Sequence, residues 1–174
     1  MDHPISSKLE IVIPAYRWHS QSFLHALDGI SDEDSLVRVS GVTNHIIWVA
    51  GNFVNMRYSL AWMLGIREED PNSDLFFQGK ALDESYQYPS LKELKQNFHH
   101  ISSLVYQKLL VTTDKELAVV FPMGIDVSFY EENILNFVGM CIGREDYLTG
   151  TIALMRKILE YPPMKYDVDE NLKY

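Results

Sequence analysis

Polar residues interrupt two otherwise apolar helical faces of this sequence, and they are its candidates for chemistry. In residues 44–65, His45, Trp48 and Asn52 recur at spacings of three and four, which places them on one face of a helix. Nearer the C-terminus, a second face at the same spacing comprises Phe137, Cys141, Arg144, Leu148, Thr151 and Met155. The second face would be wholly apolar without Arg144 and Thr151. A site would therefore have to be built around Asn52 and Arg144.

Each candidate has a structural explanation as well as a functional one. Arg144 can lay its stem along apolar surface and extend its guanidinium to solvent or to a carboxylate such as Glu145 or Asp146. Alternatively, it can end in a pocket between helices and bind a carboxylate or phosphate. Asn52 can equally be a core amide that fixes the register of its helix. His45 lies near a predicted helix start, where capping or a surface position is more common than metal binding.

The sequence contains none of the common catalytic motifs. It has no glycine-rich phosphate loop, no GxSxG, no HExxH and no CxxC. The single cysteine, Cys141, excludes an internal disulfide and a cysteine-rich zinc site, so we expect a buried thiol in a reducing compartment.

Composition and charge disfavour nucleic-acid and membrane partners. The net charge is −9, and the 15 basic residues are scattered rather than gathered into a stripe. The N-terminus lacks the basic start and apolar run of a signal peptide, and no segment approaches the roughly 18 apolar residues of a membrane span. We therefore expect a cytoplasmic protein.

Helical periodicity predicts an all-α protein with four long helices. These are one over about 14–30, one between a cap at Thr43 or Asn44 and a stop at Gly65, one from Ser90 to Leu109, and one from Ser128 to about Leu159. Because each has one apolar face, we expect a four-helix bundle with its core at the shared centre. The chain, residues 1–174, is then a single domain with its core over about 14–160, a lead-in and a C-terminal tail.

Local signals define some helix starts better than others. Ser90 with Glu93, and Ser128 with Glu131, both have the spacing of a capping box. The apolar LEIVI that precedes Pro14 fits either an extended lead-in or a first helical turn. Residues 66–89 show no helical period, and connections of this length tend to be functional or to cover another part of the protein.

Three segments resemble the DinB-like (YfiT-like) helical bundles. NHIIWVAGNFVNMRYSLAWMLG is similar to the second helix of that family. FFQG followed by YQYPSLKEL resembles the segment that leads into its third helix, and REDYLTGTIALMRKIL resembles its fourth. The three occur in the family's order, and the resemblance as a whole extends over most of residues 14–160. The resemblance implies a four-helix bundle that often forms homodimers.

The resemblance also implies a metal site, and this sequence departs from it. Family members hold a divalent metal with one histidine of helix 2 and two of helix 4, and some are thiol-dependent S-transferases or hydrolases. Those positions correspond here to Asn52, Arg144 and Leu148, and Thr151 stands where the family usually has glutamine. A guanidinium has no lone pair to donate. Its charge about 4 Å from a divalent ion costs about 8 kcal/mol at an effective dielectric of about 20, before solvent reduces it.

We therefore expect a metal-free protein without the family's catalysis. In this hypothesis the Arg144 guanidinium occupies the volume of the lost ion, hydrogen-bonded to Asn52, and anchors a small anionic ligand in a pocket that also includes Trp48, His45 and Thr151. The alternative is a metal-dependent hydrolase or S-transferase that holds zinc or nickel through other ligands, such as His45 with Glu145 or Asp146. A pure scaffold or partner-binding protein remains the third interpretation.

Overall fold

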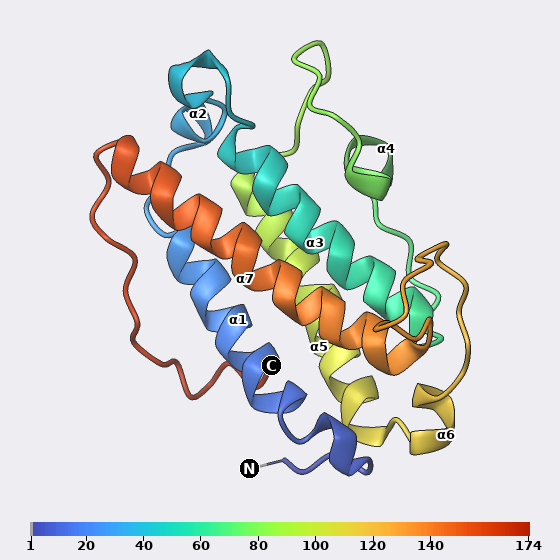
Figure 1. Cartoon of the computed structure of the whole chain (residues 1–174). Coiled ribbons are helices and arrows are strands. Elements are labelled where there is room, and N and C mark those ends of the chain that lie inside the picture. The colour runs from blue at the N-terminus through green and yellow to red at the C-terminus, as the bar shows by residue number, and fades with distance from the viewer. Residues whose placement is uncertain (1) are drawn as a thin grey trace.

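Four long helices dominate the computed structural model, which describes residues 2–174. They are α1 (Val12–Ala26), α3 (Ile46–Met63), α5 (Leu91–Val111) and α7 (Ile134–Ile158). α3 packs against both α5 and α7, and α1 packs against the same two helices (Figure 1). Within the described residues the only β-pairing is an isolated bridge between Val120 and Asn133. The predicted all-α class is confirmed.

α3 is the most enclosed of the long helices. Its buried residues lie on all sides, and the Phe53 ring stacks on Phe23 of α1 with ring centroids 4.2 Å apart. Phe98 of α5 completes this aromatic centre, 4.7 Å from Phe23. α3 also carries buried Asn52 and Arg57. Over residues 2–174, no helix combines the length and apolar character that crossing a membrane requires.

The predicted helix starts are right at α5 and wrong at α7. Ser90 and Glu93 form the complete capping box expected at the start of α5. α7 begins at Ile134, where Asn133 accepts a hydrogen bond from the Asn136 backbone, and Ser128 remains in the preceding loop. Glu132 explains the difference, because its carboxylate accepts the backbone N–H groups of Met123 and Ile125 at 2.8 and 2.6 Å. These bonds hold residues 121–132 as a closed loop.

α1 begins earlier and ends earlier than its predicted range of 14–30. Residues Ser7–Leu9 form a 3-10 turn, η1, and Val12 and Ile13 already belong to α1, so LEIVI contributes a first helical turn. Arg156 of α7 caps this earlier end, because it donates to carbonyl oxygens in the last turn of the helix and just beyond it. Nη1 of Arg156 reaches the carbonyls of His25, Ala26 and Asp28 at 3.2, 2.8 and 3.0 Å.

Short elements fill the connections. α2 (Asp32–Ser35) and the 3-10 turn η2 (Val39–Gly41) lie between α1 and α3, and α6 (Asp114–Leu117) follows α5. The long 66–89 connection contains α4 (Ser73–Phe76) and the 3-10 turn η3 (Phe77–Gly79). Phe76 at the end of α4 is buried, and its ring lies where a Cβ on Gly51 of α3 would stand. The connection therefore covers α3.

The C-terminal tail is irregular, as expected, but it is bound to the helices. Residues 162–174, here called the C-terminal strap, run back along α1 (Figure 1). The Gln21 amide of α1 donates to the carbonyl oxygen of Asp169 at 2.8 Å and accepts from its N–H at 3.2 Å. Arg17 donates to the Leu172 carbonyl at 3.3 Å, and the Tyr174 hydroxyl lies 2.7 Å from Nδ1 of His99.

Candidate functional site

The candidate site lies where α3 and α7 pack together. The two helices run antiparallel (Figure 1), and their register is set by contact between Arg57 and Glu145. Toward the start of α3 and the end of α7, Asn52 lies five residues before Arg57 and Leu148 three residues after Glu145, so each stands roughly one helical turn from this pair. Both side chains are buried.

The buried face of α7 includes Phe137, Cys141, Leu148 and Met155 of the predicted face, but it is centred closer to Glu145 than to Arg144. Glu145, Thr149 and Ile152 are buried, whereas Arg144 and Thr151 are only half-buried. The prediction was wrong for Arg144 and Thr151 because apolar residues occur on most sides of this 25-residue helix, so periodicity alone does not fix the edges of the face that turns inward. Arg144 therefore lies at the border of the interface.

Arg144 has an unpartnered donor. Its Nε atom is buried and has no hydrogen-bond partner in the part of the chain that the structure describes. The two carboxylates next to it in sequence are used elsewhere: Glu145 contacts Arg57, and Asp146 contacts His19 at 3.0 Å. A buried N–H left without a partner costs about 1–3 kcal/mol. A ligand that accepts this hydrogen bond would recover part of that cost.

The other predicted site residues bond mostly to their own helices. Nδ2 of Asn52 donates to the Trp48 carbonyl at 3.0 Å, and the Thr151 hydroxyl donates to the carbonyl of Tyr147 at 2.8 Å. The Trp48 indole donates to the Lys80 carbonyl at 3.1 Å, which ties α3 to the long connection. Among the described hydrogen bonds, the expected one between Arg144 and Asn52 is absent.

His45 caps α3, in place of the predicted Thr43 or Asn44. Its Nδ1 accepts the backbone N–H of Trp48 at 2.9 Å, and its buried ring packs edge-on against Tyr88. Burial, with the charge of Arg38, lowers the pKa of His45 below its ordinary value of 6.5. A capping role was the expected alternative to metal binding for this residue.

The cap makes stability depend on pH. Because the folded pKa of His45 lies below the unfolded value, the unfolded chain binds the proton more tightly, and stability falls as the pH drops through about 6.5. We expect the free energy of unfolding to fall by about 1 kcal/mol more in the wild type than in His45→Asn between roughly pH 7.5 and pH 5.5. Asparagine caps without titrating, so urea unfolding at both pH values measures the difference. Equal losses would contradict this role.

A buried ion pair close to the candidate site was not predicted. Arg57 and Glu145 are both fully buried, and Nε and Nη2 of Arg57 donate to the two carboxylate oxygens at 2.7 and 3.0 Å. Nη1 of Arg57 donates to the Ser20 hydroxyl at 2.9 Å, and the guanidinium lies 3.7 Å from the centre of the Tyr16 ring. α1, α3 and α7 meet at this cluster.

The network continues from the core to the surface through His19. Nδ1 of His19 lies 3.1 Å from Oε2 of Glu145, and its Nε2 lies 3.0 Å from the exposed Asp146. Burial alone would raise the pKa of Glu145, but the charge of Arg57 and the hydrogen bond from His19 hold that pKa below its usual range. Glu145 is therefore an ionised carboxylate whose two oxygens are already engaged.

A sequence signal for this pair existed, although it was weak. Arg57 follows Phe53 by four residues, so it lies on the buried and otherwise apolar face of this helix. An arginine on such a face requires a partner. Its partner, Glu145, lies 88 positions away, and only the tertiary register identifies it.

The structure separates the residues of the alternative metal site. His45 lies at the start of α3, and Glu145 packs beside Arg57, twelve residues or about 18 Å further along that helix. In residues 2–174, no group of three or more His, Cys, Asp and Glu side chains is arranged to hold a metal ion.

Cys141 does not supply a nucleophile at this interface. The thiol is buried, and its Sγ lies 3.3 Å from Sδ of Met56. Burial, with the negative charge of Glu145, raises the pKa of Cys141 far above its ordinary value, so the thiolate is disfavoured.

In comparisons with known proteins, no family model, no curated protein and no solved structure matches the chain.

Proposed function

We propose that this chain is a metal-free four-helix bundle of the DinB-like kind that binds a small anionic ligand between α3 and α7. The observation that carries the proposal is the buried Nε of Arg144, which has no partner in residues 2–174. A guanidinium at a helix interface without a carboxylate partner is suited to a carboxylate or phosphate brought by a ligand.

The side chains at the implied metal position do not fit a divalent ion. Asn52 offers at most one amide oxygen, Leu148 offers no donor atom, and the Arg144 guanidinium has no lone pair. Glu145 cannot replace them while both of its oxygens accept hydrogen bonds from Arg57. We therefore derive no catalytic step through a metal for this chain.

Inorganic phosphate is a suitable first probe for Arg144. At about ten times its dissociation constant, a ligand adds about 1.4 kcal/mol to stability, which raises the thermal midpoint of a chain of this size by roughly 3–5 °C. Phosphate also stabilises proteins through exclusion from their surface. The quantity to compare is therefore the rise in thermal midpoint that phosphate causes beyond sodium chloride of equal ionic strength. This rise should be larger in the wild type than in Arg144→Gln.

A matched variant separates a specific anion site from general charge effects. Lys157→Gln removes an exposed cation from the same helix and should keep the phosphate response of the wild type. Equal responses in wild type and Arg144→Gln would contradict the anion site. Stoichiometric zinc, nickel or manganese in untagged protein, measured by elemental analysis, would overturn the metal-free assignment.

Because DinB-like bundles often form homodimers, we also propose that this chain forms a homodimer in the cytosol. Met140, Tyr147 and Leu154 of α7 are exposed and lie seven residues apart, which leaves an apolar stripe on that helix. Sedimentation equilibrium tests this part, and a species of 20.1 kDa would exclude the dimer.

A further inference from the structure

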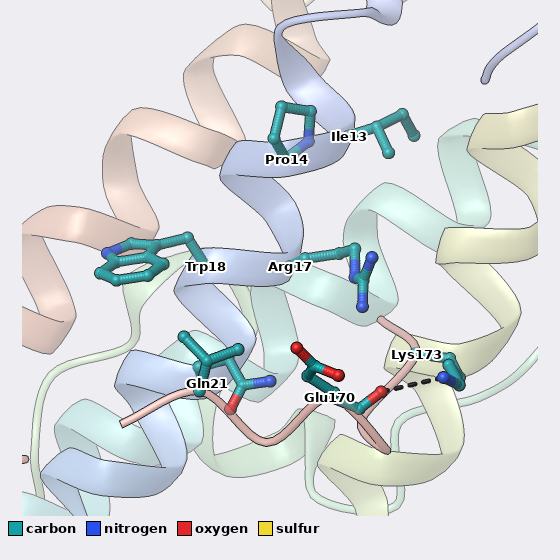
Figure 2. Close-up of a pocket in the computed structure, with 8 residues that line it drawn as sticks. Ile13, Pro14, Arg17, Trp18, Gln21, Glu170 and Lys173 are labelled. Carbon is teal, nitrogen blue, oxygen red and sulfur yellow. Dashed lines mark hydrogen bonds between the residues drawn. The ribbon is translucent and has the colours of Figure 1, made fainter. Parts of the chain in front are cut away.

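A cavity of about 470 Å³ lies between α1 and the C-terminal strap, away from the Arg144 site. Its helical wall consists of Ile13, Pro14, Arg17, Trp18 and Gln21, and its other wall consists of Val168, Glu170 and Lys173 (Figure 2). This volume lies within the range of small-molecule sites in proteins. The two walls come from opposite ends of the chain, so the strap completes the cavity.

The cavity contains charged groups of both signs that lack ionic partners within residues 2–174. Arg17 donates to the Leu172 carbonyl at 3.3 Å and also contacts the Tyr106 hydroxyl, and Nζ of Lys173 donates to the Glu170 carbonyl at 2.9 Å, so neither cation is bound to a carboxylate. Neither they nor Glu170 take part in a salt bridge of the described chain. In Figure 2 Arg17 and Trp18 point to opposite sides, and the Glu170 carboxylate lies below them, nearer to Arg17.

Apolar surface accompanies these charges. The Trp18 side chain is 49 % exposed although it belongs to a long helix, and Ile13 and Pro14 continue the same wall. An exposed indole on the wall of a cavity that also holds charged groups offers a face for an apolar or aromatic group of a ligand. A simple anion would use Arg17 and Lys173 but would meet the negative charge of Glu170. A simple cation would pair with Glu170 but would be repelled by Arg17 and Lys173.

We propose that this cavity binds a small zwitterion, an α-amino acid with an apolar or aromatic side chain. The ligand carboxylate pairs with Arg17 and Lys173, its ammonium group pairs with Glu170, and its side chain packs on Trp18. Because the strap supplies Glu170 and Lys173, bound ligand also holds the strap against α1. The site shares no residue with the Arg144 site, so the failure of either proposal leaves the other standing.

The three tryptophans of the full chain provide the readout. In ¹H–¹⁵N spectra with L-phenylalanine, we expect the Trp18 indole resonance to shift and to saturate with a dissociation constant of about 1 mM. The indole of Trp62 is also exposed but packs against Phe121 elsewhere, so its resonance should not move. Trp18→Phe assigns the resonance.

Ligand analogues and variants test each charge. Phenylalanine amide lacks the carboxylate and 3-phenylpropionate lacks the ammonium group, and each should bind roughly ten-fold more weakly. Arg17→Gln and Glu170→Gln should weaken the binding of L-phenylalanine by a similar factor. Lys115→Gln, which removes an exposed cation of α6, should leave that binding unchanged. Slower hydrogen exchange of the Asp169 amide, which bonds to Gln21, should accompany binding.

Three results would overturn the proposal. They are a Trp18 resonance that does not shift, equal shifts of Trp18 and Trp62, and equal affinity for L-phenylalanine and its two analogues. If Arg17→Gln proves unfolded, Glu170→Gln on the exposed strap tests the same pairing without altering α1.

Discussion

Glu145→Gln is expected to lower the free energy of unfolding by about 3–5 kcal/mol, because it leaves the guanidinium of Arg57 buried without a counter-charge. Both side chains of the pair are fully buried, and two hydrogen bonds of 2.7 and 3.0 Å join them. Domains of this size are stable by only about 5–15 kcal/mol. Urea unfolding at neutral pH should therefore show a variant that has lost a large share of its stability.

The same substitution at an exposed ion pair is the control. Arg38 and Glu84 are also 2.7 Å apart but remain partly exposed, and Glu84→Gln should cost less than about 1 kcal/mol. Combining Glu145→Gln with Arg57→Met removes the stranded charge and should recover most of the loss. If the double variant is no more stable than Glu145→Gln, or if the two glutamine variants are equally stable, the pair does not have this role.

The features predicted correctly from the sequence are those set by neighbours in the chain. α5 has a complete capping box at Ser90 and Glu93 and a regular apolar repeat, so its start required no tertiary information. Ser128 and Glu131 have the same spacing, but Glu132 binds the loop before them and delays the start of α7. The local sequence indicates where a helix can start, and tertiary contacts determine whether it starts there.

The site was harder to predict because it depends on how the helices face each other. Choosing Arg144 rather than Glu145 as the inward residue of α7 is an error of one position, or about 100° around the helix. Such an error exchanges a buried carboxylate for a residue at the border of the interface. The position of the C-terminal strap could not be predicted for a similar reason. Gln21 binds the backbone N–H and carbonyl of Asp169, and these groups are present whatever the residue type at position 169.

Gly51→Ala is expected to destabilise the protein by about 2–4 kcal/mol, although alanine is the better helix former. A Cβ at this position would overlap the buried ring of Phe76, so the ring must leave its place on α3. Losing the burial of a phenylalanine costs about 3–5 kcal/mol, and the gain in helix propensity offsets about 1 kcal/mol of it. Urea unfolding measures the loss. Faster hydrogen exchange in residues 73–79 should show that α4 has detached.

Gly150 of α7 is the matched control, because nothing lies within 4 Å of a Cβ built there. Gly150→Ala should therefore stabilise the protein by about 0.5–1 kcal/mol. Adding Phe76→Leu to Gly51→Ala should restore part of the lost stability, since a smaller side chain can share the space with the new methyl group. If Gly51→Ala is as stable as Gly150→Ala, the Phe76 ring does not rest on Gly51, and the 66–89 connection does not cover α3.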